Sequence, residues 1–223
     1  MALSIRRLSP LAAAAGIVLF LGSSSGLGAQ NERVIPIGDD PSRKEGSPGL
    51  VLVEMSDFQC PYCSQAALAL LPKVEEKFVR TGKVEIVFLD LPLEMHPHAF
   101  KAAEAAACAG EQKKFWEMHD LLFANQRALA LDQLPGHAGK LGLDAAAFQK
   151  CLSEGTQSAG VREDLNVAST LGISNTPSFL LGRRKPDSDK LEILQVIRGL
   201  PPYEYLEGRI NALLAPPKQG EGR

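Results

Sequence analysis

Two cysteines separated by two residues, Cys60-Pro-Tyr-Cys63, offer the most specific chemistry in this sequence. The pair follows an apolar run typical of a buried strand and precedes a helical pattern. At such a turn the first thiol lies beside the unpaired N–H groups and the positive end of the helix dipole, which stabilise a thiolate. A thiolate attacks disulfides, and a second thiol one turn further on can attack the mixed disulfide that results. We therefore predict thiol–disulfide exchange, with Cys60 as the nucleophile and Cys63 as the resolving cysteine.

Two other uses of such a cysteine pair compete with exchange. A zinc site would need two more ligands, for which His96, His98 and His119 are the candidates, but the sequence has no second close cysteine pair. A purely structural disulfide would close a loop so small that it would constrain the unfolded chain little. We therefore expect no metal ion and no cofactor, and we assign all four histidines, His137 included, to the surface or to helix ends.

Two further elements could take part in the exchange. Glu54 lies in an otherwise apolar run, where burial would raise its pKa and allow it to accept the proton of Cys63. The alternative is a carboxylate at a strand end with its head in water. Thr176-Pro177 precedes a short predicted strand, and a cis bond there would expose the Thr176 backbone to an extended substrate beside Cys60. From the spacing alone, an ordinary trans bond is the alternative.

The elements that must position these residues follow from the hydrophobic patterns. The order strand, helix, strand over residues 50–89 predicts a βαβ unit with a parallel strand pair. The last two predicted strands form a hairpin around a charged turn. Pro72 should kink the first helix, and Pro135-Gly136 leaves the region around it unassigned. We predict strands over 34–37, 50–55, 84–89, 178–181 and 191–197, and helices over 61–80, 98–109, 113–125, 144–152, 161–171 and 202–214.

Composition places the chain among ordinary globular proteins. Its 223 residues suit one domain, or one domain with an insertion, and can bury a sizeable core. The hydrophobic fraction of 45% and the charged fraction of 22% argue against disorder, collagen and a membrane protein with many spans. The formal net charge of -2 gives no electrostatic reason to expect nucleic acid as a partner.

The amino-terminal segment has the sequence pattern of an export signal. Arg6 and Arg7 precede an uncharged stretch over 8–30, with a short apolar core and a small-residue exit. This pattern predicts a secretory signal peptide over 1–29, cleaved near Ala29. An uncleaved membrane anchor is the alternative, since the whole stretch could just span a bilayer. Both place the mature chain in the periplasm or another extracytoplasmic compartment.

With these motifs in place, the chain resembles the thioredoxin superfamily and, within it, the DsbA-like thiol:disulfide oxidoreductases. The resemblance covers about residues 35–214 and rests on the segments 53–63, 107–125 and 171–179. It implies an α/β thioredoxin fold with an inserted α-helical domain, a cis bond at Thr176-Pro177 and the acidic role of Glu54. We expect an edge strand and linker over 30–48, the two halves of the thioredoxin core over 49–96 and 172–214, a helical insertion over 97–171 and a disordered tail over 215–223.

The resemblance also implies partners. The substrates would be unfolded or reduced exported polypeptides, contacted through Pro61, Tyr62, Thr176 and Pro177. A membrane redox partner, either a quinone-linked reoxidase or a reductant, would recycle the site of a monomeric protein. The Pro61-Tyr62 dipeptide differs from the Pro-His of the best-studied oxidising members, so a reductase or isomerase stays an alternative. A peptide-binding module without catalysis is the rival from another class.

The remaining cysteines, Cys108 and Cys151, both fall in the predicted helical insertion, 43 positions apart. We expect them to form a structural disulfide after export, because free thiols beside an oxidising site are a liability. Two independent small buried residues are the alternative.

Overall fold

The structure, a computed structural model, describes residues 33–38 and 40–216. The predicted signal peptide and the predicted tail beyond residue 216 lie outside the described residues. Within the described ranges, no helix combines the length and the apolar character needed to cross a bilayer.

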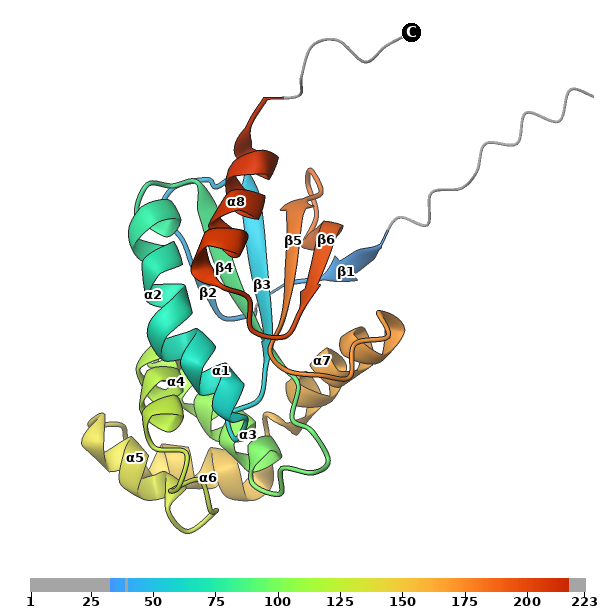
Figure 1. Cartoon of the computed structure of the whole chain (residues 1–223). Coiled ribbons are helices and arrows are strands. Elements are labelled where there is room, and N and C mark those ends of the chain that lie inside the picture. Colours follow the sequence, from blue (N-terminus) through green and yellow to red (C-terminus); the bar gives the residue numbers. More distant parts are fainter. Residues whose placement is uncertain (1–32, 39, 217–223) are drawn as a thin grey trace, which may run out of the picture. The chain divides into compact units, whose positions relative to one another are not determined.

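A mixed sheet of six strands lies at the centre, in the order β1-β6-β5-β3-β4-β2 (Figure 1). Strand β3 is parallel to β4 and antiparallel to β5, and β5 and β6 form the predicted hairpin. The short β2 pairs with β4 inside what we had expected to be linker, because two residues are too few to produce a pattern. The strands are β1 Val34–Pro36, β2 Ser42–Arg43, β3 Leu50–Ser56, β4 Val84–Asp90, β5 Ser178–Arg184 and β6 Lys190–Arg198.

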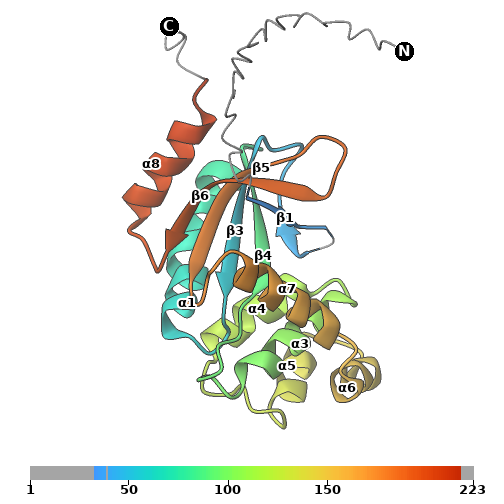
Figure 2. The same cartoon turned by 90° about the vertical axis from the view of Figure 1, so that its right-hand side faces the viewer.

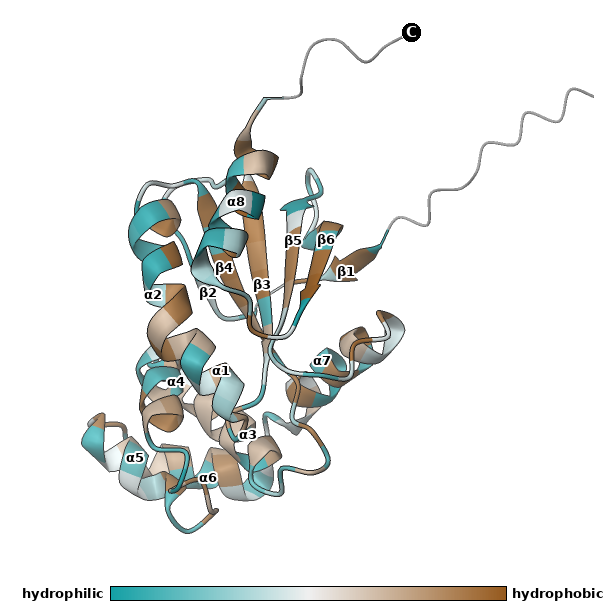
Figure 3. Ribbon diagram, in the orientation of Figure 1, coloured by the Kyte–Doolittle hydropathy of each residue, from teal (hydrophilic) through white to brown (hydrophobic). Residues whose placement is uncertain are grey.

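Helices cover both faces of this sheet (Figure 2). The segment 61–79 and the helix α8 (Tyr203–Leu214) pack on one face, against side chains such as Leu52, Ile86 and Phe179. The helix α7 (Ser158–Thr170) packs on the other face, against Val53 and its neighbours. With both faces covered, β3 and β4 are buried along their whole length, and their sequences are hydrophobic apart from Glu54, Ser56, Glu85 and Asp90 (Figure 3).

The first helical segment alternates between two helix types. It consists of α1 (Pro61–Gln65), the π-helical turn η1 (Ala66–Leu70), α2 (Leu71–Val74) and the π-helical turn η2 (Glu75–Val79). Pro72, predicted to distort this helix, is the second residue of α2, two positions after the first π turn ends at Leu70. Such turns interrupt the regular ladder of helix hydrogen bonds, and Pro72 has no N–H to contribute to that ladder.

Four helices form the inserted domain: α3 (Ala99–Gly110), α4 (Phe115–Ala124), α5 (Leu134–Lys140) and α6 (Ala145–Glu154). Helix α5 occupies the region left unassigned around Pro135-Gly136, since proline is tolerated in the first helical turn. In the predicted insertion over 97–171, the last helix has two roles. Val161 of α7 belongs to the core of the inserted domain, whereas Val167 packs against the sheet.

The prediction that all four histidines lie at the surface or at helix ends was wrong for His119, which lies in the middle of α4 and is 1% exposed. His137 lies in the last turn of α5, as the prediction allows, but it is also buried, with 2% exposed. His119 Nδ1 lies 2.8 Å from Asp120 Oδ1, and His137 Nε2 lies 2.8 Å from the carbonyl oxygen of Ala128. Each ring thus pairs one nitrogen inside the protein, which lowers the cost of burying it.

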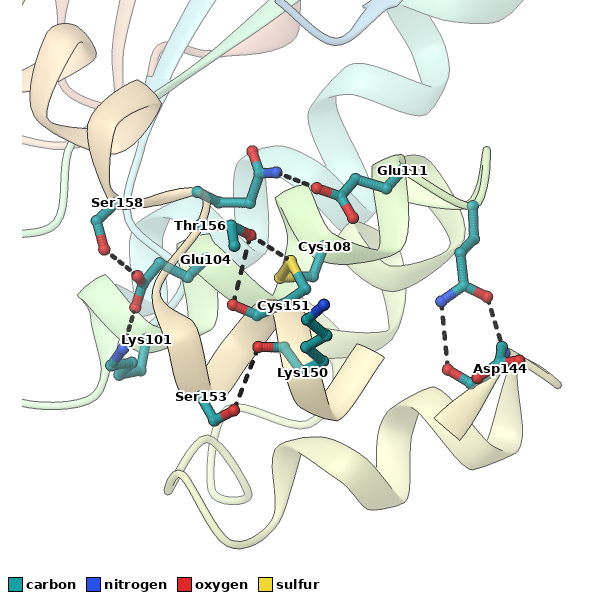
Figure 4. The surroundings of a disulfide bond; sticks show 12 residues. Lys101, Glu104, Cys108, Glu111, Asp144, Lys150, Cys151, Ser153, Thr156 and Ser158 are labelled. Carbon is teal, nitrogen blue, oxygen red and sulfur yellow. Dashed lines mark hydrogen bonds and ion pairs between the residues drawn. A yellow bond between two sulfur atoms is a disulfide. The ribbon is translucent and has the colours of Figure 1, made fainter. Parts of the chain in front are cut away.

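A disulfide between Cys108 of α3 and Cys151 of α6 braces the inserted domain (Figure 4). The two Cα atoms lie 5.9 Å apart, within the usual range for a disulfide. Both residues belong to the hydrophobic core of the inserted domain. The Thr156 hydroxyl, 3.0 Å from Cys151 Sγ, packs directly beside the bond.

Replacing both Cys108 and Cys151 with alanine should lower the free energy of unfolding by about 4 kcal/mol, because the disulfide closes a long loop in the unfolded chain. Urea unfolding of the oxidised proteins measures the difference, and Cys60 and Cys63 are left intact in both. A loss below about 1 kcal/mol would show that this disulfide does not constrain the unfolded chain.

Candidate active site

Cys60 is the residue that caps the start of α1. Its backbone is extended, with φ −74° and ψ 123°, and Pro61 occupies the first helical turn. The carbonyl oxygen of Cys60 accepts hydrogen bonds from the backbone N–H groups of Cys63, at 3.1 Å, and Ser64, at 3.2 Å. Its thiol therefore lies at the amino end of a helical segment, the position that the sequence predicted.

The two thiols differ in their access to solvent. Both are free in the described structure. Cys60 keeps 5% of its surface exposed, Cys63 keeps none, and Tyr62 between them is 59% exposed. The backbone N–H of Asp57 donates to Cys63 Sγ at 3.5 Å. Cys60 is therefore the thiol that solvent can reach, whereas Cys63 is enclosed by the protein.

The environment separates the acidities of the two thiols. A hydrogen bond from the Cys63 thiol, helped by Thr176 and by the helix backbone, lowers the pKa of Cys60 to about 5 even though burial opposes it. Burial, together with the hydrogen bond to Cys60, raises the pKa of Cys63 well above its ordinary value. Cys60 is therefore a thiolate at neutral pH, and Cys63 is a thiol.

Thr176 and Pro177 lie opposite Cys60. The peptide bond between them is cis. Cys60 Sγ lies 3.6 Å from the carbonyl oxygen of Thr176, a contact between residues 116 positions apart in the sequence. The loop before β5 and the start of α1 therefore form two sides of one site.

Glu54 lies inside β3 and has no exposed surface. Its Oε1 accepts a hydrogen bond from the Ser56 hydroxyl at 2.9 Å, and its Oε2 has no hydrogen-bond partner within the described structure. Burial raises the pKa of Glu54 to about 8, a shift that Ser56 and Arg43 only partly offset. A hydrogen bond with Ser56 also acts on the Cys63 thiol. The Ser56 hydroxyl thus connects Glu54 with Cys63, and the strand-end alternative for Glu54 does not match its burial.

Two further residues hold the segment before Cys60, and sequence analysis missed both. The Gln126 side-chain amide donates to the carbonyl oxygens of Phe58, at 2.9 Å, and Cys60, at 2.8 Å. Asp57 accepts from the backbone N–H of Leu93 at 2.7 Å. The sequence carried no signal for Gln126, which lies 66 positions from Cys60. Asp57, a polar residue between strand and helix, could have been singled out.

The other two zinc candidates, His96 and His98, contact the segment just before Cys60. His96 Nδ1 lies 2.8 Å from Asp57 Oδ2, and the backbone N–H of His98 donates to Gln59 Oε1 at 2.9 Å. Within the ranges that the structure describes, no group of three or more His, Cys, Asp or Glu side chains is arranged to hold a metal ion.

Comparison with solved structures shows the fold. Alpha-DsbA1 from Wolbachia pipientis matches with a TM-score of 0.68 and 21% identity, over 81% of this chain and 93% of that one. BdbD from Bacillus subtilis, in its oxidised form, matches with 0.66 and 21%, over 78% and 92%. DsbA2 from Pseudomonas aeruginosa matches with 0.64 and 24%, over 80% and 96%. At these identities the likeness concerns the fold, a thioredoxin fold with an inserted helical domain.

Curated relatives match over a part of their length. The Na(+)/H(+) antiporter NhaA 1 of Salinispora arenicola is 38% identical over 178 residues, which cover 78% of this chain and 26% of that protein. The Na(+)/H(+) antiporter NhaA 3 of Salinispora tropica is 37% identical, with the same coverage. The chain thus spans about a quarter of the length of these relatives.

The family model described as Thioredoxin matches residues 47–197, which include both cysteines of the site and Thr176-Pro177. The chain therefore belongs to the thioredoxin family, and its fold is that of the DsbA-like members.

Proposed function

We propose that this protein is a thiol:disulfide oxidoreductase that exchanges disulfides with polypeptides through Cys60 and Cys63. The observation that carries the proposal is the pair of unequal thiols. Cys60, with a pKa of about 5, lies at a helix start beside the Thr176 carbonyl group, and the completely buried Cys63 lies behind it. This arrangement supplies a nucleophile, a good leaving group and a protected resolving thiol in one site.

The low pKa of Cys60 favours oxidation of the substrate. A stable thiolate favours the reduced form of the site, so the oxidised form tends to pass its disulfide on. A substrate thiolate attacks Cys60 Sγ, and the sulfur of Cys63 leaves. A second substrate thiolate then attacks the mixed disulfide and releases Cys60. The substrate loses two electrons and gains a disulfide, while the protein gains two thiols.

The surroundings of Cys60 suit an extended polypeptide. The Thr176 backbone beside Cys60 can pair with a substrate strand, and the exposed Pro61 and Tyr62 offer an apolar contact on the other side. Backbone pairing makes little demand on the substrate sequence, which fits a broad range of clients.

Glu54 would accept the proton of Cys63 through the Ser56 hydroxyl when Cys63 attacks a mixed disulfide. The hydrogen bond from Ser56 to Glu54 and the effect of Ser56 on Cys63 support this path. Glu54 must be a carboxylate to accept a proton, so its pKa of about 8 limits the resolving step at neutral pH.

We also propose that the protein acts outside the cytoplasm, with a membrane redox partner that restores the oxidised site. The signal-like sequence of residues 1–29 supports export, and so does the Cys108–Cys151 disulfide, because such bonds persist in oxidising compartments. Amino-terminal sequencing of the exported chain tests this proposal, with a start at Gln30 as the expected result. Recovery of the full chain from the cytoplasm alone would contradict it.

The alkylation rate of Cys60 in the reduced protein should rise with pH around a midpoint of about 5. Iodoacetamide labelling between pH 3 and pH 10, read by intact mass, measures this midpoint. Since the hydrogen bond from Cys63 is the largest cause of the low pKa, the variant Cys63→Ala should shift the midpoint upwards. An equal midpoint in the two proteins would exclude Cys63 as the cause.

The oxidised protein should restore activity to a reduced, unfolded disulfide protein, and the variant Cys60→Ala should not. Equilibration with glutathione measures the potential of the Cys60–Cys63 pair. A value near about −120 mV is expected for an oxidase, whereas one near about −270 mV would identify a reductase. Retention of full activity by Cys60→Ala would instead favour a binding module.

The variant Glu54→Gln should slow the resolving step at every pH, because an amide cannot accept the proton. It should also stabilise the protein at pH 7 by up to about 3 kcal/mol, because the folded protein no longer holds a carboxyl whose pKa is raised from 4.5 to about 8. Between these two pH values the unfolded wild-type chain releases a proton that the folded protein retains, so wild-type stability falls as pH rises. Unfolding of both proteins at pH 4 and pH 7 checks the sign, with no gain expected at pH 4.

A further inference from the structure

Each catalytic cycle of the proposed exchange moves one proton into and out of a buried site. Cys63 takes up a proton when it leaves as a thiolate, and gives it up when it attacks. Glu54, the proposed acceptor, has no exposed surface. Its proton must therefore reach solvent by a route through the protein.

His119 of α4 is a buried titratable residue that the exchange has not used. Its ring lies among five aromatic side chains, at 5.0 Å and 89° from the ring of Phe88. The other four rings have centroids between 4.8 and 6.2 Å from that of His119. One ring nitrogen, Nδ1, faces Asp120, and the other, Nε2, has no hydrogen-bond partner among the described residues. The four other aromatic residues are Phe58, Phe115, Trp116 and Phe123.

Glu54 lies on the same side of the sheet. It pairs in register with Phe88 on the neighbouring strand β4, so the two side chains point to the same face. Phe88 is therefore a neighbour of both Glu54 and His119. The charged groups that act on Glu54 are Arg43, Asp120 and Glu75. Arg43 bonds to Asp120, and Asp120 in turn bonds to His119.

The unpartnered atoms of the two side chains are complementary. Oε1 of Glu54 accepts from Ser56, so the proton of the neutral carboxyl lies on Oε2. Although burial opposes it, His119 and Arg43 lower the pKa of Asp120, which makes it an acceptor for the Nδ1 proton of His119. Burial lowers the pKa of His119, so its Nε2 carries a lone pair at neutral pH. A donor, Glu54 Oε2, and an acceptor, His119 Nε2, thus each lack a partner in the described chain, and both side chains neighbour Phe88. The two atoms do not hydrogen-bond each other in this structure, so a proton passes between them through one bridging water or after a small side-chain movement.

We propose that His119 relays protons between Glu54 and Asp120, whose half-exposed carboxylate opens the route to water. The proposal rests on the exchange function of Cys60 and Cys63 and on the role of Glu54 as acceptor. The Oε2–H proton of neutral Glu54 first passes to Nε2 of His119, and the Nδ1 proton passes to Asp120 and on to water, which leaves Glu54 as a carboxylate. When Cys63 then attacks, its S–H bond breaks, and the proton reaches Oε1 of that carboxylate through the Ser56 hydroxyl. The ring is left as its other tautomer, and the proton that enters in the next half-cycle resets it.

The charged groups around this route come from several elements. Asp120 contributes from α4, Arg43 from β2 and Glu75 from η2, with Arg43 bonded to both carboxylates. The side chain of Asp120 is 50% exposed, whereas that of Arg43 is 23% exposed. Asp120 is therefore the group of this cluster from which a proton most readily reaches solvent. In the proposed relay, His119 acts on Cys63 only through Glu54.

The variant His119→Phe tests the relay, since it keeps an aromatic ring within the aromatic cluster and removes both nitrogens. Quenched-flow experiments, in which reduced protein is mixed rapidly with excess oxidised glutathione, quenched with acid and analysed by mass, separate the attack by Cys60 from the resolving attack by Cys63. The attack by Cys60 depends on glutathione concentration, whereas the resolving attack by Cys63 does not. In the variant, the resolving step should slow at least about tenfold at pH 6.5 and recover the wild-type rate above about pH 9, where Glu54 is already a carboxylate. The attack by Cys60 should not change.

His137→Phe is the matched control, because His137 is also buried in the inserted domain but its ring nitrogen Nε2 lies 2.8 Å from the backbone carbonyl oxygen of Ala128, in the loop between α4 and α5. It should leave both steps at the wild-type rate. If His119→Phe does not fold, Asp120→Asn replaces it, since it keeps the oxygen that faces Nδ1 and removes the exit for the proton. This variant should show the same defect below pH 8.

The outcomes separate the relay from the function on which it rests. A resolving step that Glu54→Gln slows and that His119→Phe and Asp120→Asn leave unchanged overturns the relay alone. A step that none of the three variants affects overturns the role of Glu54 as well. A defect of His119→Phe that is equal at all pH values would identify a packing effect and would also overturn the relay.

Discussion

Hydrogen bonding along both edges of β3 is the constraint on which the active site depends. Ser56, the last residue of β3, pairs with Asp90 of β4, and Met55 pairs with Ser178 of β5. Ser178 comes two residues after Thr176, so the pairing of β3 with β5 fixes the Thr176-Pro177 loop at the same end of the sheet as the cysteines. A shift in register by one residue would also reverse the faces to which Glu54 and its neighbours point.

The same residue type performs two tasks at positions 60 and 63 because the surroundings differ. The start of α1 leaves Cys60 at a helix end with hydrogen-bond donors around it, whereas Cys63 faces the interior. The inserted domain contributes to this difference. Gln126 holds the backbone at Cys60, and the Ser64 hydroxyl donates to the carbonyl oxygen of Phe123 at 3.0 Å. The insertion thus encloses the interior side of the site, whereas Tyr62 on the outer side is exposed.

Two buried polar groups behind the cysteines carry a cost that an apolar core would avoid. Glu54 and His119 each pair one polar atom, with Ser56 and Asp120, and each keeps one atom without a partner in the described residues. Burial of such atoms is unfavourable by about 1–3 kcal/mol each. In the proposed relay these two unpartnered atoms are the ones between which a proton passes. The Cys108–Cys151 disulfide stabilises the domain that contains His119 against this cost.

The sequence by itself determined the features that depend on neighbouring residues: the cysteine pair at a strand-to-helix turn, the βαβ unit, the hairpin and the inserted helices. Hydrophobic periodicity and helix-capping residues act over a few positions, so they can be read without a structure. Only the tertiary structure decided the burial of His119 and His137, the contacts of Gln126 and the pairing of β2. It also selected the cis form of Thr176-Pro177 and the pairing of Cys108 with Cys151 from alternatives that the residues left open. These features join residues far apart in the chain, and a local pattern does not report which distant atoms will surround a side chain.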